Sequence, residues 1–247
     1  MPEARPHPLT RRQPGAARGI LSQHTVPVEP FYAGSTRKVT LYAPEAAQPL
    51  PLLVVYDGND YGGRGRLPVL LDNLIDQGRI PPVAAALVHN RPRERFLEYN
   101  CSDSTVGFIA NRVLPLAAEQ LNLIDIHANP GAYTILGASM GGLMALFPSL
   151  RLPQVFGRAL CQSGAYQLGE FETIVFDWVR HMPLPPVRLW MDVGRYEWLL
   201  DCNRQMHQLL SRQGFVHAYH EYFGGHNYTA WRNDLWQGLE YIFSPDF

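Results

Sequence analysis

Short apolar segments alternate with longer segments of helical periodicity along most of this chain, and this alternation restricts its fold more than any other feature. The segment 50–56 is apolar almost without interruption, which is typical of a strand covered on both faces. The expected strands are 38–42, 50–56, 83–88, 132–136, 158–162, 187–193 and 218–223, and the expected helices are 67–77, 105–121, 142–150, 198–213 and 230–243. This order predicts an α/β fold with a doubly wound, mostly parallel sheet that begins near residue 38 and is flanked by helices as a three-layer sandwich.

The length of 247 residues suits one domain. Residues 1–20 are rich in Pro, Arg and Ala without periodicity, so we expect a flexible N-terminal arm there. Residues 21–247 then form a single domain. The segment 166–186 is the least regular stretch between two expected strands, and the sequence leaves open whether it covers the functional site as a short lid.

Charge and cysteine usage exclude several classes of protein. The chain has 21 Lys and Arg against 22 Asp and Glu, so no basic excess favours nucleic acid or an acidic membrane as a partner. Cys101, Cys161 and Cys202 form no C-x-x-C motif, and we expect neither a metal nor a cofactor. No segment has the length and apolarity of a signal peptide or a membrane span, which predicts a cytoplasmic protein.

Gly137-Ala138-Ser139-Met140-Gly141 lies between the strand-like segment 133–136 and the helix-like segment 142–150. Glycines on both sides of a serine relieve crowding in a tight strand-to-helix turn, so that the serine hydroxyl stands exposed above the sheet edge. The same five-residue pattern also occurs in ordinary turns. Its flanking segments favour a nucleophile elbow, with Ser139 as the nucleophile.

A serine nucleophile needs a histidine to accept its proton and a carboxylate to orient that histidine. In folds with a nucleophile elbow, these residues follow the serine in the order acid, then histidine. His226 follows the expected strand 218–223 on a glycine-rich loop, so we expect it to be the general base. A loop histidine with a routine hydrogen bond is the alternative. His217 and His220 belong to a strand, and His207 lies within a helix.

The carboxylate is expected after the preceding strand, 187–193. Glu197 lies past the end of that strand at the start of a helix, and it is our candidate. Asp192, within the strand, and Asp201, in the first turn of the helix, are alternatives that can both be structural, because a carboxylate in a first helical turn is favourable without catalysis.

Cleavage also requires donors for the oxyanion, usually the amide after the nucleophile and an amide from an earlier strand-to-helix loop. Met140 provides the first amide. The segment Asp57-Gly58-Asn59-Asp60 follows the expected strand 50–56, and we predict the Asn59 amide as the second. Asp-Gly is also a common turn sequence, so a plain turn is the alternative.

Several separated motifs between residues 38 and 243 together resemble one family. They are Gly137 to Gly142, Gln162-Ser163-Gly164, Gly194-Arg195-Tyr196-Glu197, Asn203 in its helix, Gly224-Gly225-His226 with Trp231-Arg232, and Arg95 with Glu98, Asn100-Cys101 and Phe108. The chain resembles the enterochelin (enterobactin) esterases and the wider group that includes esterase D, feruloyl esterases and the antigen 85 mycolyltransferases. The resemblance implies an α/β-hydrolase fold and a serine hydrolase of carboxylic esters, with Ser139, Glu197 and His226 as its triad.

The family resemblance implies a small-molecule ester such as a ferric siderophore as the substrate. Arg95 and Arg232 are candidates to contact such an anionic ligand, although structural ion pairs are the alternative, and Arg95 is spaced for one with Glu98. Tyr61, Trp198 and Trp231 are candidates for aromatic walls, with the core as the alternative. An acyltransferase of the antigen 85 type and a non-catalytic binding module are the competing functions, and the oligomeric state is open.

Overall fold

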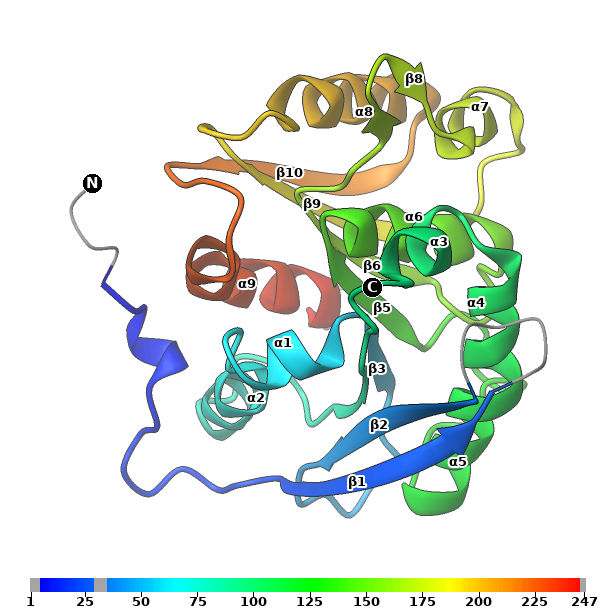
Figure 1. Ribbon diagram of the computed structural model, residues 1–247. Helices are drawn as coiled ribbons and strands as arrows, with labels where there is room; N and C mark the ends of the chain where they lie inside the picture. The colour runs from blue at the N-terminus through cyan, green and yellow to red at the C-terminus, as the bar shows by residue number, and fades with distance from the viewer. Residues whose placement is uncertain (1–4, 29–34, 245–247) are drawn as a thin grey trace.

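An eight-stranded sheet forms the centre of the protein, whose computed structural model describes residues 5–28 and 35–244 (Figure 1). Its strands, in spatial order, are β1 (Ile20–Pro27), β2 (Thr36–Ala43), β4 (Ala84–Val88), β3 (Leu52–Val55), β5 (Thr134–Ala138), β6 (Arg158–Gln162), β9 (Arg188–Gly194) and β10 (Val216–Tyr222). The six strands from β4 to β10 are mutually parallel, which confirms the predicted mostly parallel sheet.

Two hydrophobic clusters lie on opposite faces of this sheet. Along β3, Leu52 and Val54 belong to one cluster, whereas Leu53 and Val55 belong to the other, because successive side chains of a strand point to opposite faces. The first cluster packs against α5 (Leu114–Gln120), α6 (Met140–Arg151) and α8 (Leu200–Gln213), and the second against α2 (Leu67–Asp76) and α9 (Tyr228–Phe243). Figure 1 shows the two helical layers on either side of the sheet, as the predicted three-layer sandwich requires.

One edge of the sheet differs from the prediction. The strand β2 does not begin the parallel part, because it is antiparallel to both β1 and β4. The strand β1 was not predicted, since most of its residues are exposed and its sequence has no apolar run. A strand that pairs at an exposed edge needs little apolar surface, so its sequence carries a weak signal.

The helix predicted over 105–121 consists of three consecutive helical segments. These are α4 (Asp103–Phe108), the π-helical turn η2 (Ile109–Val113) and α5. Pro115, near the start of α5, has no N–H to donate, and its ring would clash with the carbonyl four residues earlier. The wider π-helical turn before it avoids this clash while the chain continues in one direction.

The described part of the predicted N-terminal arm contacts the domain (Figure 1, dark blue). Asn73 Nδ2, on α2, donates hydrogen bonds of 2.7 Å to the Leu9 carbonyl and 2.8 Å to the Arg11 carbonyl. The short helix η1 (Pro8–Thr10) buries Leu9, and the His7 ring stacks on Trp236 of α9. Residues 1–4 of the arm lie outside the described residues, and its flexibility stays a prediction.

The irregular segment 166–186 contains a small hairpin and a helix. The hairpin is formed by β7 (Gln167–Leu168) and β8 (Phe171–Glu172), and the helix is α7 (Ile174–His181). The Trp178 ring of α7 stacks on Phe147 of α6, so the helix is held against the domain, and the role of the segment as a lid stays a prediction. Two further short helices are α1 (Gly58–Gly62) and α3 (Arg95–Tyr99). Within residues 5–28 and 35–244, we find no helix of sufficient length and apolarity to cross a membrane.

Candidate active site

Ser139 occupies the turn between β5 and α6 with φ 60° and ψ −123°, a backbone conformation that side-chain-bearing residues rarely adopt. The turn is tight enough to require its flanking glycine. A Cβ atom on Gly137 would lie 2.1 Å from the Gly141 carbonyl oxygen, so any other residue there would displace the backbone. The G-x-S-x-G sequence thus has a steric cause in this fold, and it projects Ser139 from the carboxyl end of the central strand.

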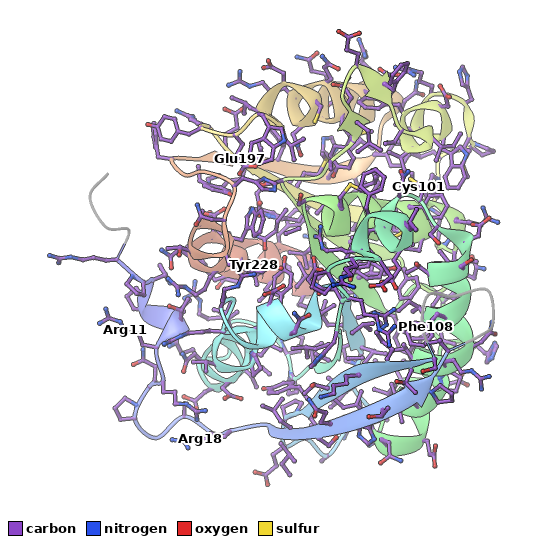
Figure 2. The ribbon with its side chains drawn as sticks, in the orientation of Figure 1. Arg11, Arg18, Cys101, Phe108, Glu197 and Tyr228 are labelled. Carbon is purple, nitrogen blue, oxygen red and sulfur yellow. The ribbon has the colours of Figure 1, made fainter. Side chains whose placement is uncertain are left out.

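The structure brings Ser139, His226 and Glu197 together in one hydrogen-bonded chain. His226 Nε2 lies 2.9 Å from Ser139 Oγ, and His226 Nδ1 lies 2.7 Å from Glu197 Oε2. Glu197 follows β9, and His226 lies on the loop between β10 and α9. Figure 2 shows Glu197 near the ends of β9 and β10, and Tyr228 at the start of α9.

The two alternative carboxylates lie elsewhere. Asp192 is fully buried in β9, where its Oδ2 accepts hydrogen bonds from Gln162 Nε2 at 3.0 Å and Trp190 Nε1 at 2.9 Å. Asp201 is exposed on α8, and its carboxylate lies 3.9 Å from an Arg204 nitrogen. Neither carboxylate has a hydrogen bond to His226 among the described residues, in contrast to Glu197.

Three donors hold the second oxygen of the Glu197 carboxylate. Oε1 accepts hydrogen bonds from the Gly194 amide at 2.9 Å, the Ser163 hydroxyl at 2.8 Å and the Tyr222 hydroxyl at 3.3 Å. Burial and the neighbouring carboxylates raise the pKa of Tyr222 far above its usual range, so its hydroxyl remains protonated as a donor. The Glu197 side chain is fully buried, and its charge is therefore stabilised by fixed donors rather than by water.

Sequence reasoning did not assign a role to Ser163 or Tyr222. Ser163 follows β6 and has a positive φ of 45°, which aims its side chain at the end of β9. The motif Gln162-Ser163-Gly164 belongs to the family resemblance and follows a buried strand. This position could have indicated that Ser163 lies near the candidate site. Tyr222 ends β10, four residues before His226, and nothing in its local sequence distinguishes it from a core tyrosine.

Two tryptophans contact the His226 ring. The Trp198 ring centroid lies 4.4 Å from that of His226, and the Trp231 ring meets His226 edge-on at 4.8 Å. Trp198 is 76 % exposed, whereas Trp231 is buried and donates its indole N–H to Ser163 Oγ at 2.9 Å. Both predicted aromatic residues thus border the site, and together they limit how the imidazole can rotate.

Tyr61 and Arg232 are not placed as expected. Tyr61 is 1 % exposed and donates a hydrogen bond of 3.0 Å to Gln162 Oε1, so it belongs to the core rather than to a cavity wall. Its ring also meets that of Tyr228 edge-on, with the ring centroids 5.5 Å apart. Arg232 Nε donates to Asn233 Oδ1 at 3.3 Å and lines neither of the two cavities beside Ser139 described below.

Arg95 lies beside Ser139, but its ion-pair partner differs from the expected one. Its guanidinium donates to both oxygens of Asp57, at 2.7 and 2.6 Å, in a bidentate arrangement. Glu98, the expected partner, instead forms a buried ion pair with Arg37 of β2. Asp57 is 1 % exposed and lies between the end of β3 and the start of α1. The ion pair between Arg95 and Asp57 therefore connects α3 to the carboxyl end of the sheet.

Met140 and Asn59 each lie at the beginning of a helix, α6 and α1 respectively, where amide groups lack intrahelical acceptors. Within the described chain, neither amide donates a hydrogen bond to another protein atom. The Asn59 side chain is held by the Asn90 amide, which donates to its Oδ1 at 3.1 Å. Both amides are therefore available to an external acceptor, and their role as oxyanion donors stays a prediction.

Ser139 borders two cavities of different character. The polar cavity, of about 520 Å³, is lined mainly by the charged and amide side chains of Asp57, Asp60, Arg64, Asn90, Arg95 and His226, together with Pro92, Tyr228 and Trp231. The apolar cavity, of about 340 Å³, is lined mainly by Phe96, Met140, Ala165, Leu168, Trp198 and Leu199, together with the polar side chains of Ser139 and Gln167. Both volumes are in the range of small-molecule sites. No group of three His, Cys, Asp or Glu side chains in the described ranges is placed to hold a metal ion.

Solved structures share this fold. The enterobactin esterase of Shigella flexneri, in the presence of 2,3-dihydroxy-N-benzoyl-glycine, superposes with a TM-score of 0.83 at 22 % identity over 94 % of this chain and 62 % of its own. A ferulic acid esterase gives a TM-score of 0.77 at 18 % identity, over 92 % of this chain and 98 % of its own. These likenesses define the fold as an α/β-hydrolase-type fold.

The family described as "Putative esterase" matches residues 32–242, and this chain belongs to it. The iron(III) enterobactin esterase of Dickeya dadantii is 30 % identical over 85 % of this chain and 52 % of its own length. The iron(III) salmochelin esterase of Escherichia coli O6:H1 is 30 % identical over 84 % of this chain and 54 % of its own length. The family predicted from the motifs is confirmed, and the chain spans about half the length of these curated relatives.

Proposed function

We propose that this protein is a serine esterase that hydrolyses a carboxylic ester through an acyl-enzyme. The observation that carries the proposal is the chain of hydrogen bonds from Glu197 to His226 to Ser139, at 2.7 and 2.9 Å. A hydroxyl in this setting can lose its proton to the imidazole as it attacks a carbonyl carbon. Family membership supports the same chemistry.

Each residue of the chain has a distinct role in this mechanism. Ser139 Oγ attacks the ester carbonyl while His226 Nε2 accepts its proton, and the same imidazole then protonates the departing alkoxide. Water repeats the sequence on the acyl-enzyme and releases the acid. Glu197 keeps the Nδ1 proton on His226 and stabilises the imidazolium, and the Met140 and Asn59 amides donate to the oxyanion.

A siderophore ester is the substrate that the relatives favour, because two of them are named as esterases of iron(III) enterobactin and iron(III) salmochelin. The partner is then a small molecule. Acyl transfer of the antigen 85 type differs only in the final acceptor, so product analysis with and without added alcohols separates it from hydrolysis.

Replacement of the nucleophile tests the proposal. Ser139→Ala is expected to lower kcat/KM for p-nitrophenyl acetate by about 10³-fold or more and to abolish labelling by a fluorophosphonate, with an unchanged circular dichroism spectrum. Ser211→Ala, at an exposed serine of α8, is the matched control and should retain full activity. Turnover and labelling that survive in Ser139→Ala would overturn the assignment, and a wild-type protein without either would favour a binding module.

A further inference from the structure

We infer that the two parts of the ester are divided across Ser139, with the acyl part in the apolar cavity and the alcohol part in the polar cavity. The substrate class that this division favours is an ester of a hydrophobic carboxylic acid with a hydroxyl-bearing or amide-bearing alcohol, in place of the siderophore esters for which the two relatives are named. The inference rests on the proposed function, since it assigns sides to the reaction that Ser139 and His226 carry out.

The position of His226 sets the direction. The alkoxide that leaves the tetrahedral intermediate must receive its proton from His226 Nε2, so the alcohol lies on the side of Ser139 that faces the imidazole. In the part of the chain that the structure describes, His226 lines the polar cavity and not the apolar one. The acyl group, which remains on Ser139 after the alcohol departs, is left with the apolar cavity.

The polar cavity is built to form hydrogen bonds. The ion pair of Arg95 with Asp57 lies in its wall, as does that of Arg64 with Asp60 at 2.5 Å. The two guanidinium charges balance the two carboxylate charges, so recognition there depends on oriented donors and acceptors rather than on a net charge. Asn90 adds an amide group to the same wall. Hydroxyl or amide groups of an alcohol can meet such a set without leaving it unpaired.

The apolar cavity exposes large side chains to water. Phe96, on α3, is 53 % exposed, and Trp198, before α8, is 76 % exposed, although the two are about a hundred residues apart in the sequence. Leu168 of the β7–β8 hairpin and Leu199 complete the wall beside them. Contact with an apolar acyl chain would remove this surface from water, which is favourable, whereas a charged acyl group would lose its hydration there.

Phe96→Ala tests the acyl side, because Phe96 is exposed and its removal costs the fold little. Wild type is expected to prefer p-nitrophenyl hexanoate to p-nitrophenyl acetate by about tenfold or more in kcat/KM. The variant should lower this hexanoate-to-acetate ratio by about fivefold. Phe171→Ala removes a phenyl group that is 79 % exposed and lines neither of the two cavities, so it is the matched control and should keep the ratio.

Arg64→Ala tests the alcohol side. It is expected to lower the ratio of kcat/KM for glycerol 1-hexanoate to that for p-nitrophenyl hexanoate, two esters with the same acyl group, by about fivefold. Arg180→Ala, which removes the arginine of a surface pair with Glu172 on the β7–β8 hairpin, is the control and should keep this ratio. The reverse pattern, in which Phe96→Ala changes the alcohol ratio and Arg64→Ala the acyl ratio, would overturn the assignment of sides.

The failure of this inference differs from the failure of the proposed function. If Ser139→Ala abolishes activity while wild type shows no acyl preference, the division of the ester is wrong and the serine esterase stands. If Ser139→Ala retains activity, the proposed function is wrong, and with it the inference.

Discussion

The Ser163 hydroxyl donates a hydrogen bond of 2.8 Å to Glu197 Oε1, and its oxygen accepts the indole N–H of Trp231 at 2.9 Å. One side chain therefore connects the carboxylate of the site to a tryptophan that borders His226. Ser163 is fully buried and adopts a positive φ of 45°, so this position is set by the end of β6. In the proposed mechanism, Ser163 acts on the reaction through Glu197 and is a positioning residue.

Ser163→Ala is expected to lower kcat by about 10- to 100-fold with little change in KM, because a hydrogen bond to a buried carboxylate contributes about 1.5–3 kcal/mol. The Trp231 indole would also lose its acceptor. Steady-state kinetics with one activated ester measures the effect. Ser149→Ala, at a fully buried serine in α6 that bonds the Leu146 carbonyl, is the matched control. Equal kinetics in the two variants would exclude the positioning role.

Glu197→Gln should reduce kcat by about 10⁴-fold at neutral pH while the fold is retained. The amide group can donate to His226 Nδ1, which would place the imidazole proton on Nε2 and remove its ability to accept the Ser139 proton. Asp201→Asn tests the exposed alternative carboxylate and should behave as wild type. A large loss in Asp201→Asn with a small loss in Glu197→Gln would reverse the assignment of the acid.

Arg95→Leu is expected to destabilise the protein by about 3 kcal/mol, because it leaves the buried Asp57 carboxylate without its bidentate partner. Urea denaturation measures the change in the free energy of unfolding. Arg180→Leu breaks a surface pair with Glu172 and should cost no more than about 1 kcal/mol. If the two variants lose equal stability, the Asp57 pair is not part of what holds α3 to the sheet.

Asp192 predicts a pH dependence of stability. Burial, with the Asp234 charge nearby, raises the pKa of Asp192 well above its ordinary value of 3.8. The folded state thus favours the protonated acid, and this contribution is complete below the unfolded pKa and is lost as the pH rises through the folded one. Asp192→Asn keeps an acceptor for Gln162 and Trp190 but does not ionise.

The stability of Asp192→Asn relative to wild type should therefore increase with pH above about 3.8, by up to about 1.4 kcal/mol per pH unit. Chemical denaturation at several pH values gives the two curves. Asp201→Asn, at an exposed site, should run parallel to wild type. Parallel curves for Asp192→Asn as well would show that Asp192 is ionised in the folded protein.

The parts of the fold that could be predicted from sequence are those whose burial is uniform. The run 50–56 is apolar because both faces of β3 are covered, and the strand ends that carry Ser139 and Glu197 follow the similarly buried strands β5 and β9. The strand β1 could not be found in this way, because its exposed edge leaves no hydrophobic pattern. The order of strands and helices along the chain was enough to predict that Ser139, Glu197 and His226 lie at the same end of a parallel sheet.

Pairings between side chains were less predictable. Local spacing favours Glu98 as the partner of Arg95. In the structure, however, Glu98 is buried beside Arg37 of β2, and Arg95 pairs with Asp57, which follows β3. Tyr61 is an aromatic residue after a strand end, which is compatible with a cavity wall and with the core. Only the packing of α1 against β4 and α9 separates the two.

The strand β10 lies at the outer edge of the sheet, where β9 is its one partner among the described residues, and its side chains are all at least partly exposed. The loop that follows it carries His226, whereas Ser139 follows the central strand β5. Elements at the edge of a sheet, which have few buried contacts, unfold locally more readily than the strands at its centre. In the proposed mechanism, catalysis therefore depends on the least protected strand of the parallel sheet, and mild denaturation should abolish esterase activity while most backbone amides still resist hydrogen exchange.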